Sequence, residues 1–118
     1  TCALPIFCDE HNIALQSWFP LGHGNNEMLN DEVFVNLANK YQKTTVQVIL
    51  RWHTQMGFGL VPGSKSTDHI KENAEIFDFT LTDEEMALIA TVNKHQPFYQ
   101  VTKESLQKLA TTKCNFEE

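Results

Sequence analysis

The segment over residues 59–73 constrains the fold of this chain more than any other, and it reads GLVPGSKSTDHIKEN. It is typical of a short buried strand at Leu60 and Val61, followed by a Pro-Gly turn, small hydroxyl residues and the start of a helix. A strand that opens through Gly and Ser onto a helix N-terminus can hold phosphate, because backbone N–H groups face outward there and the helix dipole favours negative charge. A capped helix with a polar face has the same pattern, so both interpretations stay open at this point.

Most of the remaining chain has a helical pattern. Apolar spacing and capping signals predict helices over residues 4–11, 31–42, 44–56, 68–77, 82–92 and around 101–109. We expect Asn30 to cap the second helix, and Ile70, Ala74 and Phe77 to face inward from the fourth. Residues 44–56 alternate like a strand as well as a helix. Their length, the threonine cap and the glycine that follows favour the helix.

The strongest local signal is a capping box formed by Thr82 and Glu85, with Leu81 and Met86 as its hydrophobic staple. The neighbouring Glu84 and Glu85 look like a catalytic carboxylate pair. Because Glu85 has a capping role and Glu84 lies at the helix N-terminus, we expect neither to perform general acid–base chemistry.

Residues 13–18, IALQSW, predict a second strand, and their apolar positions suit one buried on both faces of a parallel sheet. The turn-rich loop over residues 19–26 follows its carboxyl end, where α/β proteins build their sites. Two strands among five or six helices cannot close a sheet. We therefore expect partner strands from elsewhere, including one before Thr1, or a segment of a larger barrel.

Composition narrows the class of protein. The chain has 118 residues, 42% of them apolar, a net charge of −6, a mean hydropathy of −0.32 and a pI near 5.3. These values predict a soluble globular protein that binds neither nucleic acid nor a membrane, and no apolar run approaches the roughly 20 residues that span a bilayer. Three cysteines without C-x-x-C spacing predict reduced thiols and a cytoplasmic location.

Few residues suggest chemistry by themselves. Trp18, at the end of a buried strand, fits either a packing role or contact with a ligand. The histidines have no metal-ligand spacing, and we expect most of them to be structural or solvent-exposed: His11, His23, His53, His69 and His95.

Two motifs in this order resemble the C-terminal part of the aldo-keto reductases. In that family the seventh barrel strand ends in an aromatic residue followed by x-Pro-Leu-Gly, and residues 18–22 here read WFPLG. The eighth strand runs into (I/V)-P-K-S and then R-I-x-(E/Q)-N, and residues 61–64 and 69–73 here read VPGS and HIKEN. The segments over residues 40–52 and 77–82 are also similar to the family, and the resemblance covers about residues 4–99.

The resemblance implies an α/β fold in which residues 1–118 form the helix-rich C-terminal part of one (β/α)8 TIM barrel, with its last two strands. It further implies an oxidoreductase that reduces aldehydes or ketones with NADPH. Trp18 would stack on the nicotinamide, and Glu72 and Asn73 would face the adenine. The pyrophosphate path would be lined by Phe19, Pro20, Leu21 and Gly22. The adenosine 2′-phosphate would be held by Ser64 and its neighbours Pro62, Gly63, Lys65, Ser66 and His69.

Two positions depart from the family pattern. The family lysine of the P-K-S motif is Gly63 here, and the family arginine is His69. Both cations normally face the 2′-phosphate, and a neutral histidine replaces an arginine poorly. Lys65 compensates in part. We therefore expect a weaker preference for NADPH than is usual in the family, with NADH as an alternative cofactor.

The family's catalytic Asp, Tyr, Lys and His lie on its first four strands, and nothing in this chain matches those motifs. We expect the isolated chain to be inactive and to depend on an N-terminal barrel portion. Two alternatives remain: a non-catalytic short form or fragment that self-associates, and a free-standing nucleotide-binding module that uses residues 64–73.

Overall fold

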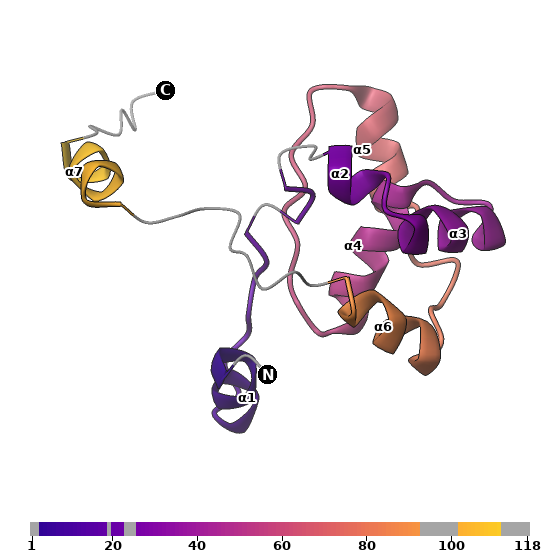
Figure 1. The fold of residues 1–118 in the computed structure, drawn as a ribbon, viewed down its shortest axis with the longest axis horizontal. Coiled ribbons are helices and arrows are strands. Elements are labelled where there is room, and N and C mark those ends of the chain that lie inside the picture. Colours follow the sequence, from indigo (N-terminus) through magenta and orange to yellow (C-terminus); the bar gives the residue numbers. More distant parts are fainter. Residues whose placement is uncertain (1–2, 19, 23–25, 93–101, 112–118) are drawn as a thin grey trace.

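The computed structural model describes residues 3–18, 20–22, 26–92 and 102–111 (Figure 1). Helices α2 to α6 pack together, whereas α1 and α7 stand apart from that group. The helices of this described part are α1 (Ala3–Glu10), α2 (Asn26–Leu29), α3 (Glu32–Tyr41), α4 (Thr45–Gln55), α5 (Thr67–Ala74), α6 (Asp83–Ala90) and α7 (Lys103–Thr111).

Capping residues define the ends of the central helices. The predicted helix over residues 44–56 is confirmed as α4, which has Thr44 as its N-cap and a capping box completed by Gln47. The N-cap of α3 is Asp31 and not the expected Asn30. Asp31 accepts a hydrogen bond from the Val33 backbone N–H at 3.0 Å, whereas the Asn30 side chain donates back to α2. Because Asp and Asn cap equally well, sequence alone cannot rank these neighbours.

The hydrophobic core lies around α4, where Val48 and Leu50 are fully buried. Helix α3 presents an apolar stripe to it, with Phe34, Leu37 and Ala38 at or below 6% exposure. The core is completed from the C-terminal side by Leu81 and Ile89, of which Ile89 belongs to α6. Burial of these apolar side chains is the main force that holds α3, α4 and α6 together.

The expected inward face of α5 is wrong. Ile70 and Phe77 are 55% and 69% exposed, and Ala74 is exposed as well. For Phe77 the reason is that α5 ends at Ala74, where the cap residue Glu75 leaves helical geometry with ψ of 51°. The helical period therefore does not continue, and Ile76 turns into the core at 4% exposure.

The two strand candidates are reduced to one parallel bridge between Gln16 and Gly59 among the described residues. The Gly59 N–H donates to the Leu15 carbonyl at 2.8 Å, and the Ser17 N–H donates to the Gly59 carbonyl at 2.9 Å. Ile13 and Val61 are 50% and 68% exposed, so the expectation of burial on both faces is wrong here. Burial of a parallel strand needs layers against both faces, and α1 lies away from this pair (Figure 1).

Within the described residues, none of the helices combines the length and apolarity needed to cross a membrane. The same residues contain no group of three His, Cys, Asp or Glu side chains that could hold a metal ion. Cys8 is a buried free thiol.

Candidate cofactor-binding site

The parallel bridge at Gln16 and Gly59 places the two predicted site segments at one edge of the fold. In a parallel pair both chains run in the same direction, so both leave the pairing region at their carboxyl ends. Trp18 follows two residues after Gln16, and Pro62 follows three residues after Gly59. The structure therefore brings the starts of residues 18–22 and 62–66 to the same edge.

The first segment combines an exposed aromatic side chain with an anchored backbone. Trp18 is 68% exposed, whereas Pro20, Leu21 and Gly22 are half-buried. Leu21 packs against the hydrophobic core. Gly22 has φ of 53°, which lies in the left-handed region that glycine enters readily. Phe19 lies outside the described residues.

The second segment leads into the N-terminus of α5. The Ser66 backbone N–H donates to Ser64 Oγ at 3.0 Å, which folds residues 64–66 into a tight turn. Ser66 is the N-cap of α5, but its side chain makes no capping hydrogen bond. The first turn of α5 thus lacks the side-chain acceptor that an N-cap serine normally supplies. Pro62, Ser64 and Ser66 are half-buried, whereas Gly63, Lys65 and His69 are exposed.

The end of α5 is fastened to the start of α4. The Glu72 carboxylate accepts a hydrogen bond from the hydroxyl of Thr44, the α4 N-cap. Gln47 Nε2 donates to the carbonyls of Glu72 and Glu75 at 3.0 and 3.2 Å. Gln47 is 5% exposed, and these bonds satisfy its buried amide. Glu72, predicted to face the adenine, is therefore bound to α4 in this structure, and Asn73 beside it is half-buried.

Two residues that sequence reasoning did not select, Ser17 and His53, lie directly beside the first segment, residues 18–22. Ser17 Oγ lies 3.0 Å from Nδ1 of His53, which projects from α4. Burial lowers the pKa of His53, and a backbone hydrogen bond with Pro20 opposes that shift. The position of Ser17 directly before Trp18 is the one available sequence signal, since nothing near His53 in the chain indicates its role.

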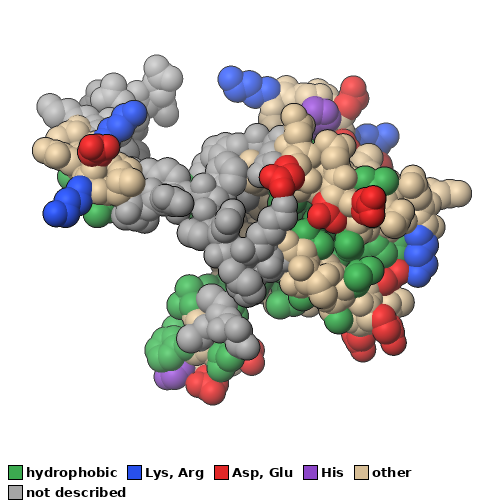
Figure 2. Space-filling model, viewed as in Figure 1, with side chains coloured by type: hydrophobic (Ala, Val, Ile, Leu, Met, Phe, Trp, Pro, Cys, Tyr) green, Lys and Arg blue, Asp and Glu red, His purple; other side chains and the backbone are tan. Residues whose placement is uncertain are grey.

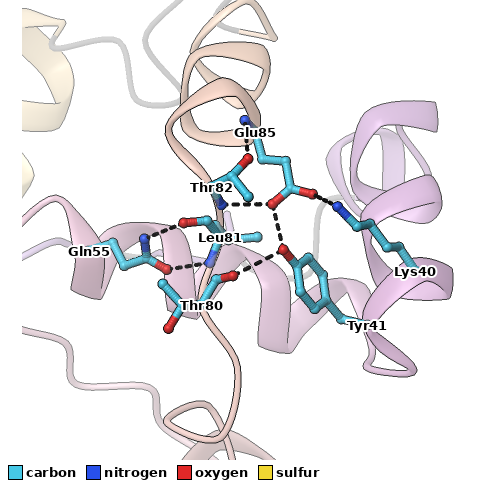
Figure 3. A network of polar contacts seen from close by, with 7 residues as sticks. All are labelled: Lys40, Tyr41, Gln55, Thr80, Leu81, Thr82 and Glu85. Atoms are coloured by element: carbon cyan, nitrogen blue, oxygen red, sulfur yellow. Dashed lines mark hydrogen bonds and ion pairs between the residues drawn. The ribbon is translucent and has the colours of Figure 1, made fainter.

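A network of charged and polar side chains lies away from both segments, between α3 and α6 (Figure 3). Glu85 receives hydrogen bonds from Lys40 Nζ at 2.5 Å, the Tyr41 hydroxyl at 2.6 Å and the Thr82 backbone N–H at 2.8 Å. Burial alone would raise the pKa of Glu85, but these donors outweigh it and lower the pKa to about 2. The carboxylate therefore stays charged and acts as a structural anchor, as its capping role predicts.

Comparison with known proteins decides the family. A sequence model described as the Aldo/keto reductase family matches residues 4–94. This chain belongs to the aldo/keto reductase family. The aldo-keto reductase resemblance that the two motifs predict is thereby confirmed.

The similarity extends to relatives in distant organisms. Aldo-keto reductase family 1 member D1 of Mus musculus is 38% identical over 104 residues, which cover 80% of this chain and 32% of that protein. Glyoxal reductase of Bacillus subtilis is 41% identical over 90 residues, covering 76% and 32% respectively. The chain spans about a third of the length of these aldo-keto reductases.

The fold is also similar to part of solved aldo-keto reductases. The Bombyx mori aldo-keto reductase in complex with NADP matches with a TM-score of 0.76 at 30% identity, covering 84% of this chain and 35% of that one. The helix-rich fold therefore corresponds to a portion of an aldo-keto reductase TIM barrel.

Proposed function

We propose that this chain is the C-terminal, cofactor-binding part of an NAD(P)H-dependent reductase that converts aldehydes or ketones to alcohols. Its residues 13–18 and 59–61 correspond to barrel strands 7 and 8. Trp18 stacks on the nicotinamide, and the Ser64 turn with the α5 N-terminus receives the adenosine phosphate. The chain binds and orients the cofactor, while the catalytic groups come from an N-terminal barrel portion.

One observation carries this proposal: the parallel bridge between Gln16 and Gly59 starts both segments from one edge. An exposed indole and an uncapped helix start on the same edge suit the two ends of an extended dinucleotide. The NADP in the Bombyx mori relative and the carbonyl reduction that the name glyoxal reductase describes support the cofactor and the substrate class.

The two tryptophans allow a direct test of cofactor binding. Replacing Trp52, which packs on the core, by phenylalanine leaves Trp18 as the sole indole reporter. We expect added NADP⁺ to quench the fluorescence of the Trp52→Phe chain, because the oxidised cofactor does not absorb the indole emission and therefore quenches by contact.

The matched control is Trp18→Phe, which keeps only the core indole. We expect its fluorescence to be unaffected by NADP⁺. Equal quenching in both variants, or quenching in neither, would refute stacking on Trp18.

Gly63 gives a second test, on cofactor preference. In the full-length protein we expect NADPH to be preferred over NADH by less than about a hundredfold, equivalent to about 2.7 kcal/mol. A Cβ at Gly63 would meet nothing within 4 Å, so Gly63→Lys is sterically free to supply the missing cation. We expect this variant to gain about tenfold in preference, mostly through tighter NADPH binding.

Calorimetric Kd values for both cofactors measure this preference. Gly63→Gln is the control, since it adds length without charge. A wild-type preference above a hundredfold, or equal gains in the lysine and glutamine variants, would contradict the role given to the missing charge.

A second candidate function is self-association without catalysis. It is favoured by the apolar side chains that α1 exposes, Leu4, Ile6 and Phe7 (Figure 2), and by exposed Ile13 and Val61 near the bridge. Sedimentation equilibrium of the 118-residue chain distinguishes the two. A monomer that binds NADP⁺ supports the reductase part, whereas a dimer without cofactor affinity supports self-association.

A further inference from the structure

The imidazole of His53 lies beside the backbone on either side of Trp18. His53 Nδ1 lies 3.0 Å from Ser17 Oγ, immediately before Trp18. The backbone carbonyl of Pro20, two residues after Trp18, lies near enough to the same ring to oppose the fall in the pKa of His53. The chain is therefore tied to α4 immediately before the indole, although the indole itself is 68% exposed.

The two contacts suit a neutral imidazole. Proline has no backbone N–H, so Pro20 offers only its carbonyl as an acceptor. A neutral ring has one donor and one acceptor nitrogen. A neutral ring can therefore accept the proton of the Ser17 hydroxyl at Nδ1. Burial favours this neutral form, since it lowers the pKa of His53.

Aromatic neighbours hold the ring in place. The His53 ring lies 4.9 Å from the Trp52 ring at an angle of 73°, and 6.3 Å from the Phe58 ring. The Phe58 backbone N–H also donates to the His53 carbonyl at 3.0 Å. The imidazole is thus packed between aromatic rings of α4 and of the residues that follow it.

We propose that His53 is a positioning residue that presets the backbone beside Trp18 for contact with the nicotinamide. The inference rests on the function proposed above for Trp18. By holding Ser17, the ring fixes the backbone from which the Trp18 side chain projects, so less conformational freedom is lost when the cofactor binds. Preorganisation of this kind increases affinity because it removes a cost of association.

The test separates the nicotinamide end of the site from the phosphate end. Calorimetry measures the Kd of the 118-residue chain for NADP⁺ and for adenosine 2′,5′-bisphosphate, which lacks the nicotinamide. In His53→Leu we expect NADP⁺ binding to weaken about tenfold while bisphosphate binding is unchanged. His53→Gln restores one donor and one acceptor and should recover most of the loss. Thr54→Ala is the control, since the Thr54 hydroxyl donates within α4, to the Leu50 carbonyl.

Amide hydrogen exchange gives a readout that does not need the cofactor. We expect faster exchange at Ser17, Trp18 and Leu21 in His53→Leu, with no change over α5. Unchanged exchange at these three residues would overturn the inference, as would parallel losses for both ligands, because a merely structural histidine gives those results. If wild-type chain binds neither ligand but His53→Leu loosens these residues, the positioning contact stands and the cofactor assignment of Trp18 fails.

Discussion

Replacing Glu85 by alanine is expected to lower the free energy of unfolding by about 3 kcal/mol at neutral pH. The substitution removes the acceptor for Lys40, Tyr41 and the Thr82 backbone N–H, and it dismantles the α6 capping box. Urea unfolding of the chain measures the change. Glu84→Gln, one residue earlier and exposed, is the control, and we expect it to stay within about 0.5 kcal/mol of wild type.

The same residue predicts how stability depends on pH. The pKa of Glu85 is about 2 in the folded state against 4.5 as its ordinary value. Its contribution is therefore fully present above about pH 4.5 and is lost as the pH falls towards about 2. A depression of this size corresponds to about 3 kcal/mol, which water around the exposed Lys40 side chain reduces to about 2.

Glu85→Gln isolates this effect, because glutamine keeps the capping box but does not titrate. We expect its stability to depend less on pH than that of wild type over this range. Two parallel pH profiles would show that Glu85 is not the linked group, and a Glu84→Gln loss as large as that of Glu85→Ala would point to general helix electrostatics.

Leu50→Ala is expected to destabilise the chain by about 3–4 kcal/mol, the other large effect. Leu50 lies on α4 at 0% exposure, so truncation removes buried methyl groups and leaves a cavity that the packed helices cannot fill. Thermal and urea unfolding both measure this loss. Leu50→Met retains most of the volume and should lose less than about 1.5 kcal/mol, which keeps the test informative if the alanine variant does not fold.

Ile70→Ala is the matched control for the core truncation. Ile70 fits the helical period of an inward face but is 55% exposed on α5. We expect its truncation to change stability by at most about 1 kcal/mol. A loss at Ile70 equal to that at Leu50 would mean that α5 is buried in solution, against the structure.

Local signals were the reliable part of the sequence. The Thr82–Glu85 box and the Thr44 cap each act within one helical turn, and both occur in the structure as predicted. The apolar stripe of α3 is equally local, because residues three and four apart share a helix face. The failed expectation at Phe77 has a local cause as well: apolar spacing predicts a helix face, but α5 ends at Ala74 and the face does not continue to Phe77.

Long-range contacts could not be predicted in this way. Lys40 and Glu85 are 45 residues apart in the chain, and Ser17 and His53 are 36 apart. Each pair meets only after the helices have packed, and no single-sequence pattern predicts which residue pairs with which. For the candidate site, the motifs predicted which residues to consider, whereas the contact between Glu72 and Thr44 and the support from His53 required the fold.

Helix α4 has a consequence for how the two halves of the candidate site are spaced. Gln47, near its start, holds the end of α5, and His53, near its end, holds the Trp18 segment. At 1.5 Å per residue, the two attachment points are about 9 Å apart along a single rigid rod. The rise of the helix therefore sets the distance between these two attachment points. Inserting one residue between them would turn one attachment point by about 100° relative to the other, so the register of α4 sets how the Trp18 backbone and the end of α5 are placed relative to each other.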